Sequence, residues 1–226
     1  MKHFITFYIL LLFSTTSFSQ KILFIGNSLT YTNDMPLILE KIGLHFHKKI
    51  ETEMVCLPNY AIIDHWNDGK IQQKIASENF DYVIIQQGPS SQEIGRKMLI
   101  EDGKKISSLC NKYNTKLGYF MVWPAKRHYF TFDKVIANHK EAARINNAIL
   151  FEVGSNWKQY QTKKNRTSLY EPDQFHPSKA GSFFAALTIF KKLFSKENLS
   201  NLPYKSVNLW VKNKASYTAM IQLLTL

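Results

Sequence analysis

Apolar and polar residues follow two different patterns along the chain, and these predict strands separated by helices. Short runs rich in apolar residues lie at 21–26, 51–57, 81–87, 116–124 and 148–154, which favours strands covered on both faces. Apolar residues three or four positions apart predict helices over 34–47, 93–113, 133–147 and 177–195, with a last short helix over 214–224. We expect the 177–195 helix to begin at Pro177, because proline favours the first helical position.

Five strands that alternate with helices predict a specific class of fold. The pattern indicates βαβ units and therefore a three-layer α/β/α, flavodoxin-like domain with a five-stranded, mostly parallel sheet. Right-handed crossovers would place helices on both faces, and ligands in such sheets bind beyond the carboxyl ends of the strands. No repeat, low-complexity segment or linker divides residues 20–226, so we expect one domain there.

Residues 1–19 have a pattern of their own. Lys2 and His3 precede the apolar run FITFYILLLF, and Ser17 and Ser19 fall at the minus-three and minus-one positions of a cut before Gln20. This is typical of a secretory signal peptide and is short for a spanning helix; an uncleaved N-terminal anchor is the alternative. No second apolar run of spanning length follows. We therefore expect a periplasmic or secreted protein with no stable membrane insertion after signal removal.

The charge balance narrows the choice of partners. Lys and Arg number 29 against 17 Asp and Glu, for a formal net charge of +12, but the basic residues are scattered. No block resembles a nucleic-acid-binding motif, so we expect no nucleic-acid partner. The charge is interpreted mainly as a solvated surface, which also favours anionic surroundings such as acidic glycans. The chain has two cysteines, Cys56 and Cys110, which cannot supply four zinc ligands; their pairing and the oligomeric state stay open.

Two short stretches carry candidate catalytic chemistry. Ser28 follows the first predicted strand in KILFIGNSLT, a position that suits either a turn or a nucleophile. A serine hydroxyl needs a neighbouring base to attack at neutral pH. His176 lies in EPDQFHPSKAG with Asp173 three residues earlier, so the carboxylate can fix the imidazole tautomer and leave the second ring nitrogen as a base. A surface turn before a helix is the structural alternative for this stretch.

The GNSLT and DxxHP stretches together resemble the SGNH (GDSL-type) hydrolase family. Asn27 stands where many members have Asp, and the order Ser28, Asp173, His176 fits the family. It does not fit α/β-hydrolases, because Thr30 stands where their elbow has its second glycine. The resemblance spans roughly residues 21–195 and implies an ester hydrolase with a Ser-His-Asp triad, without metal or cofactor.

The resemblance also implies an oxyanion hole. The family uses the N–H of the serine, the N–H of a glycine after the second strand, and a side-chain amide after the third. Here Asn59 in LPNYAIIDHW takes the glycine's place, and Asn tolerates left-handed backbone better than most residues. Ser90 falls where the family Asn would be, and QQGPS resembles the Gln-type branch of carbohydrate O-acetylesterases. We therefore predict an oxyanion hole of Ser28, Asn59 and Gln87, with Gln86 as the second choice for the amide.

These resemblances lead to one functional expectation and two alternatives. We expect a secreted serine ester hydrolase that removes O-acetyl or other short acyl groups from a small-molecule or glycan ester, with carbohydrate favoured. Trp66, Trp123, Trp157 and Tyr129 are candidates to line a sugar-binding cleft, although core packing is the commoner role of such residues. The alternatives are an O-acyltransferase with the same triad and a non-catalytic glycan-binding module on a degenerate scaffold.

Overall fold

The computed structural model describes residues 19–164 and 166–225. The predicted signal peptide, apart from its last residue Ser19, lies outside the described residues and stays a prediction.

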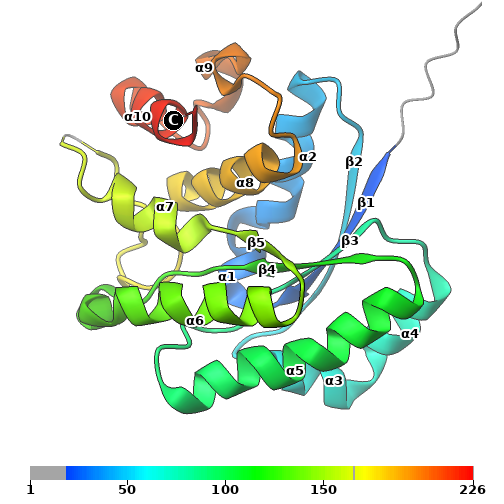
Figure 1. Ribbon diagram of the computed structural model, residues 1–226. Helices are drawn as coiled ribbons and strands as arrows, with labels where there is room; N and C mark the ends of the chain where they lie inside the picture. Colours follow the sequence, from blue (N-terminus) through cyan, green and yellow to red (C-terminus); the bar gives the residue numbers. More distant parts are fainter. Residues whose placement is uncertain (1–18, 165, 226) are drawn as a thin grey trace, which may run out of the picture.

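A five-stranded sheet, all of whose strands are parallel, forms the middle layer (Figure 1). The strands are β1 (Gln20–Gly26), β2 (Ile50–Cys56), β3 (Tyr82–Ile85), β4 (Lys116–Phe120) and β5 (Ile149–Phe151), in the order β2-β1-β3-β4-β5. The prediction of a three-layer α/β/α fold is confirmed. The fourth strand ends at Phe120 and not at residue 124, because the short partner β5 pairs with it only over Gly118–Phe120.

Helices cover both faces of the sheet (Figure 1). One layer holds α2 (Met35–His45), α7 (Val153–Tyr160), α8 (Lys179–Leu193) and α10 (Lys214–Thr225), and the other holds α3 (Ile62–Asp68), α4 (Lys70–Ser77), α5 (Glu93–Lys112) and α6 (Phe132–Ile145). The short elements are α1 (Ser28–Tyr31), η1 (Thr32–Asp34), η2 (Lys126–Thr131), η3 (Leu199–Asn201) and α9 (Tyr204–Val207). None of the helices in the described part of the chain is both long and apolar enough to cross a membrane.

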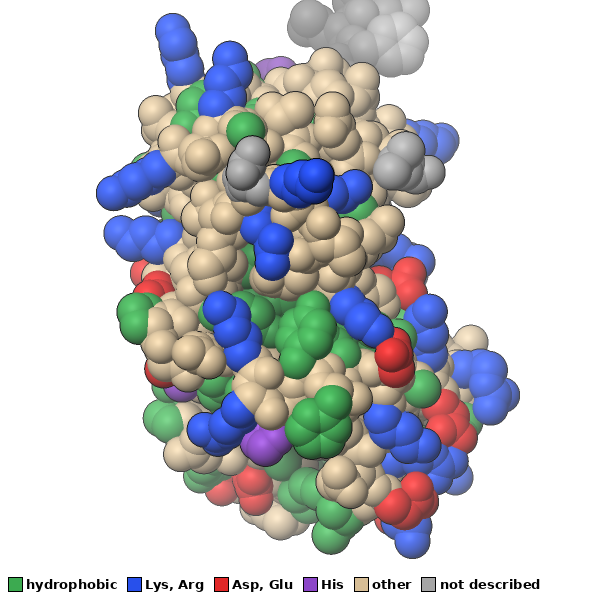
Figure 2. All heavy atoms as spheres, turned by 90° about the vertical axis from the view of Figure 1, so that its left-hand side faces the viewer, with side chains coloured by type: hydrophobic (Ala, Val, Ile, Leu, Met, Phe, Trp, Pro, Cys, Tyr) green, Lys and Arg blue, Asp and Glu red, His purple; other side chains and the backbone are tan. Residues whose placement is uncertain are grey.

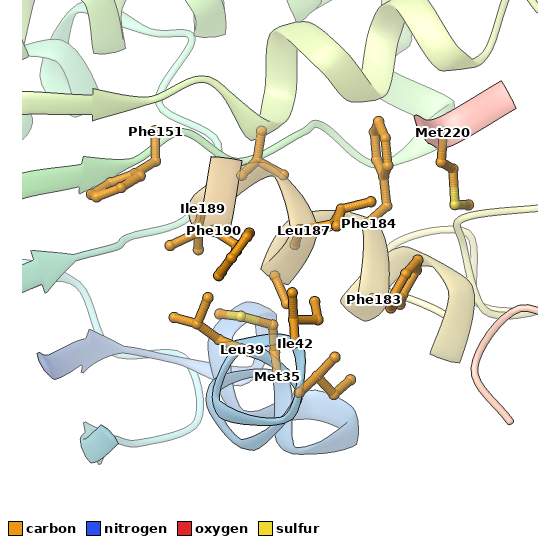
Figure 3. Close-up of a cluster of buried hydrophobic side chains, with 14 of the residues drawn as sticks. Met35, Leu39, Ile42, Phe151, Phe183, Phe184, Leu187, Ile189, Phe190 and Met220 are labelled. Carbon is orange, nitrogen blue, oxygen red and sulfur yellow. The ribbon is translucent and has the colours of Figure 1, made fainter. Parts of the chain in front are cut away.

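Helix α8 is the most deeply buried helix of its layer, and it packs against α2. Every residue from Ala180 to Phe190 is buried, which explains the almost unbroken apolar sequence AGSFFAALTIF. Figure 3 shows Leu187 and Phe190 of α8 facing Leu39 and Ile42 of α2. Since α2 follows the segment of Ser28 and α8 follows that of His176, this packing holds the two candidate catalytic segments together.

Two local predictions need correction. Helix α8 begins at Lys179 and not at Pro177, because the Ser178 Oγ accepts a hydrogen bond from the Gly181 N–H at 3.1 Å and so caps it. Pro177 instead forms an antiparallel bridge with Tyr170. Residues 62–77, for which no helix was predicted, form α3 and α4, which are joined by Gly69 with a φ of 75°. Cys56 and Cys110 are free thiols.

Candidate active site

Ser28 lies immediately after β1, at the first residue of the single-turn helix α1. Asn27 caps this helix, since its Oδ1 accepts a hydrogen bond from the Leu29 N–H at 3.1 Å. Its Nδ2 donates to the Tyr60 carbonyl at 2.9 Å, which ties the loop after β2 to the nucleophile segment. The Asn in GNSLT is therefore a brace between two loops at the carboxyl edge of the sheet.

Gln86, at the end of β3, holds the same segment from the other side. Its Oε1 accepts hydrogen bonds from the Asn27 N–H at 2.9 Å and from the Thr30 hydroxyl at 2.8 Å. A Cβ added to Gly26 would lie 2.6 Å from that oxygen, so the glycine is needed for Gln86 to approach. Sequence reasoning assigned no such role to Gln86 or Thr30; the chain turn that buries them is not visible in the sequence.

The structure brings Ser28, Asp173 and His176 together in one hydrogen-bonded chain. His176 Nε2 lies 2.9 Å from Ser28 Oγ, and His176 Nδ1 lies 2.5 Å from Asp173 Oδ2. An ionised Asp173 accepts the Nδ1 proton, so Nε2 is left to accept the proton of the serine hydroxyl. The arrangement is that of a nucleophile, a base and a group that orients the base.

The loop that carries Asp173 and His176 is fixed by its own backbone. Asp173 Oδ1 accepts hydrogen bonds from the N–H groups of Phe175 and His176, at 2.9 and 3.0 Å. The Phe175 carbonyl accepts from Trp123 Nε1 at 3.0 Å. These contacts set the position of the imidazole before any substrate binds.

Asn33 joins the two ends of the site. Its Nδ2 donates to the Pro177 carbonyl and to Ser182 Oγ, both at 3.0 Å, and its φ of 58° is the left-handed conformation that Asn tolerates. The Ser182 hydroxyl in turn donates to the Thr32 carbonyl at 3.0 Å. The segments after Ser28 and after His176 are thus connected directly as well as through α2 and α8.

The electrostatics of Asp173 favour its ionised form. The hydrogen bonds from His176 and from the Phe175 N–H hold the pKa of this carboxyl below its usual value. The side chains of His176 and Asp173 are 36% and 49% exposed, so water reaches both. This is an open site in which the carboxylate stays charged at neutral pH.

The predicted oxyanion donors divide into two groups. Asn59 has a φ of 61°, the left-handed conformation expected of a residue in the glycine's place. Neither the N–H of Ser28 nor that of Asn59 has an acceptor among the residues that the structure describes, and Asn27 holds their loops together. These two N–H groups are free to bind an anionic oxygen.

The side-chain amide of Gln87 is not free to donate to an oxyanion, contrary to what the prediction requires. Its Nε2 donates to Ser90 Oγ at 2.8 Å and to the Gly95 carbonyl at 3.4 Å, so both amide hydrogens are engaged. The reason is that successive residues at the end of a strand point to opposite sides of the sheet. Gln86 therefore reaches the nucleophile segment, and Gln87 points toward α5.

Two other histidines, His65 and His139, are buried and hydrogen-bond to backbone carbonyls. His65 lies buried on α3, and its Nε2 is 2.8 Å from the Gly26 carbonyl. His139 is buried on α6, with Nδ1 2.8 Å from the Val135 carbonyl. Burial lowers the pKa of both, that of His139 to about 4, so both are neutral at pH 7.

A cleft of about 530 Å³ opens beside the catalytic loop. Its lining includes Phe175, Pro124, Pro89, Arg127 and the 84% exposed Phe130 of η2. The ring of Phe175 also packs edge-on against that of His176, with 5.2 Å between centroids. Phe175 therefore connects the cleft to the imidazole, and the lining combines apolar side chains with Arg127.

The predicted cleft aromatics have different places. Trp123 and Trp157 are fully buried and stack on each other, with 3.6 Å between ring centroids, so core packing accounts for them. Trp66 is half-buried against the core of the α3–α6 side. Tyr129 lines an open cleft, on the other side of η2 from the cleft beside Phe175.

Comparison with solved structures assigns the class of fold: it is that of the SGNH hydrolases, esterases and acylhydrolases. A protein from Slackia heliotrinireducens classed as an SGNH hydrolase is 21% identical, with a TM-score of 0.67 over 77% of this chain and 99% of that one. A DUF4886 family protein from Bacteroides uniformis is 16% identical, with a TM-score of 0.77 over 92% and 94%. A variant of an acetyl xylan esterase from Geobacillus stearothermophilus is 12% identical, with a TM-score of 0.56 over 78% and 94%.

No protein-family model and no curated protein sequence matches the chain. At these identities the likeness to the solved structures is one of fold.

Proposed function

We propose that this protein is a serine ester hydrolase in which Ser28, His176 and Asp173 form the catalytic triad. The observation that carries the proposal is the continuous hydrogen-bonded chain from Asp173 through His176 to Ser28 Oγ, at 2.5 and 2.9 Å. The chain lies at the carboxyl edge of the sheet, where ligands bind in α/β folds. Similarity of fold to esterases and acylhydrolases adds support.

The geometry suggests the order of events. His176 Nε2 takes the proton of Ser28 as Oγ attacks the ester carbonyl, and the N–H groups of Ser28 and Asn59 bind the oxygen that becomes negative. His176 then gives its proton to the leaving alcohol, which leaves an acyl-Ser28. His176 next deprotonates a water molecule as it attacks the acyl-Ser28. His176 then returns this proton to Ser28 Oγ as the bond to the acyl group breaks, and the free acid departs. Asp173 stabilises the imidazolium throughout.

The proposed substrate is a carbohydrate that carries O-acetyl or another short acyl group, and the proposed location is the periplasm or the exterior. Two observations support this: a signal-like N-terminal segment, and fold similarity to a protein described as an acetyl xylan esterase. Because His176 and Asp173 are partly exposed, water reaches the acyl-enzyme, which favours hydrolysis over acyl transfer to a second sugar.

The test compares p-nitrophenyl acetate with longer p-nitrophenyl esters as substrates for the intact protein, Ser28→Ala and His176→Ala. The expected result is acetate turnover that both substitutions abolish, and labelling of the intact protein alone by a fluorophosphonate. Equal rates in all three proteins would refute the triad. Sugar binding without turnover in the intact protein would indicate the non-catalytic glycan-binding module instead.

A further inference from the structure

A second cleft lies on the other side of η2 from the one beside Phe175. It measures about 480 Å³, the size of many small-ligand sites. Residues of η2, of α7 with the loop that follows it, and of the segment before the catalytic loop form its walls. These residues are Lys126, Tyr129, Lys158, Gln161, Thr162, Arg166 and Tyr170.

The lining of this basic cleft holds three cations and no carboxylate. Lys158 is paired with Asp133 at 2.6 Å. Lys126 has no carboxylate within salt-bridge distance among the described residues, and its Nζ lies 5.4 Å from the centre of the Tyr170 ring. Arg166 donates from Nε to Gln161 Oε1 at 3.0 Å and from Nη1 to the Lys163 carbonyl at 2.8 Å. It too has no carboxylate partner in the part of the chain that the structure describes.

The face of the molecule at the ends of the strands also carries many positively charged side chains. Figure 2 looks at the side of the molecule where the strands end, and Lys and Arg side chains surround a central group of hydrophobic ones. Asp and Glu side chains lie mainly toward the margins of this face. A cleft bounded by fixed positive charge concentrates anions near it.

The basic cleft is connected to the catalytic loop by short contacts. The Lys126 N–H donates to the Gln174 carbonyl at 3.0 Å, and the Tyr170 hydroxyl donates to the Pro124 carbonyl at 2.9 Å. Tyr170 also pairs with Pro177, the residue after His176. Residues of the basic cleft therefore contact the loop that carries Asp173 and His176, and Phe175 of the same loop lines the cleft on the other side of η2.

The opposite side of the site has the opposite charge. A smaller cleft next to the oxyanion loop is lined by Asn59, Tyr60, Asp64 and Asp68. An anionic chain would be repelled there and attracted toward η2. The charge distribution therefore sets one direction for a charged substrate across Ser28.

We infer that the basic cleft binds an anionic group, carboxylate or sulfate, on a sugar unit next to the acylated one, so that the substrate is an acidic glycan. The inference rests on the proposed function. Lys126 and Arg166 supply the charge, and the half-buried Tyr129 supplies aromatic surface against which a sugar ring can pack.

Calorimetric titration tests the inference without any ester turnover. Trigalacturonate, a sulfated galactose trisaccharide and neutral xylotriose are titrated into the intact protein, into Lys126→Gln/Arg166→Gln, and into a control, Lys104→Gln, on the exposed face of α5. We expect one or both acidic sugars to bind more tightly than xylotriose. We expect the double variant, and not the control, to weaken that binding about tenfold or more, with a similar loss at high salt.

The outcomes separate the inference from the proposed function. A preference for trigalacturonate identifies the carboxylate as the ligand, and a preference for the sulfated sugar identifies the sulfate. Equal binding of xylotriose, or an undiminished affinity in the double variant, overturns the inference while ester hydrolysis stands. Acidic-sugar binding in a protein that hydrolyses no ester overturns the proposed function and leaves the cleft as a binding site.

Discussion

The carboxylate of Asp173 has two separable roles, and Asp173→Asn distinguishes them. Oδ1 accepts hydrogen bonds from the N–H groups of Phe175 and His176. Oδ2 accepts a hydrogen bond from His176 Nδ1, with 2.5 Å between the two atoms. An asparagine can keep the first role through its carbonyl oxygen. It then presents N–H to Nδ1, which favours the tautomer whose Nε2 carries the proton. That tautomer cannot accept the proton of Ser28.

The size of the effect follows from the exposure of the pair. The same change in serine proteases, where the aspartate is buried, costs roughly ten-thousandfold in kcat. Here the Asp173 side chain is 49% exposed, so water can in part restore the productive tautomer. We expect a loss of kcat between about a hundredfold and a thousandfold, which corresponds to about 3–4 kcal/mol of activation free energy.

Initial rates with p-nitrophenyl acetate measure this loss, and thermal unfolding checks that the loop is intact. Glu101→Gln, a carboxylate-to-amide change at an exposed position of α5, is the matched control and should leave both quantities unchanged. A kcat of Asp173→Asn within twofold of the unsubstituted protein, at an unchanged melting temperature, would refute the assignment of Asp173.

Three further predictions concern Gly26, Gln87 and His139. Gly26→Ala should lower the free energy of unfolding by about 2 kcal/mol, because the new methyl group displaces Gln86 Oε1, which accepts two hydrogen bonds. Urea titration of Gln86→Ala and of the double variant should show that Gly26→Ala destabilises the protein less when Gln86 is absent. Gln87→Ala should reduce kcat/KM by less than the roughly hundredfold expected for a lost oxyanion donor, because the Gln87 amide donates to Ser90 and Gly95. A larger loss of kcat/KM in steady-state assays would show that Gln87 belongs to the oxyanion hole. His139 has a pKa of about 4, below its unfolded value near 6.5, so the unfolded chain binds one more proton between these pH values and stability falls as pH drops through them, by at most about 3 kcal/mol. His139→Leu should flatten this part of the urea-derived stability profile, and an identical slope in both proteins would contradict the reasoning.

The sequence predicted the parts of the site that depend on order along the chain. The apolar run before Ser28 and the DxxHP spacing placed all three triad candidates, because parallel strands end at one edge and three residues suffice for Asp173 to turn back onto His176. The five strands followed from their apolar runs. Local patterns of this kind need no knowledge of distant neighbours.

The oxyanion amide and the helix starts depend on features that the apolar runs alone do not display. Gln86 and Gln87 are adjacent and chemically identical, and only the alternation of side chains along β3 separates them. Counting from the buried Ile84 and Ile85 would have signalled that they face opposite layers. Likewise, Pro177 is suited to a helix start, but its pairing with Tyr170 leaves that role to Ser178 and Lys179.

The hydrogen bonds of Asn33 to Pro177 and Ser182 join segments almost 150 positions apart, and this has a consequence for biosynthesis. Ser28 leaves the ribosome early, whereas His176, the base in the proposed mechanism, arrives near the end and is held in place only once α8 docks on α2. In that mechanism a nascent chain carries a serine that no base yet activates. A truncated chain that ends before residue 171 would keep all five strands but lack both Asp173 and His176.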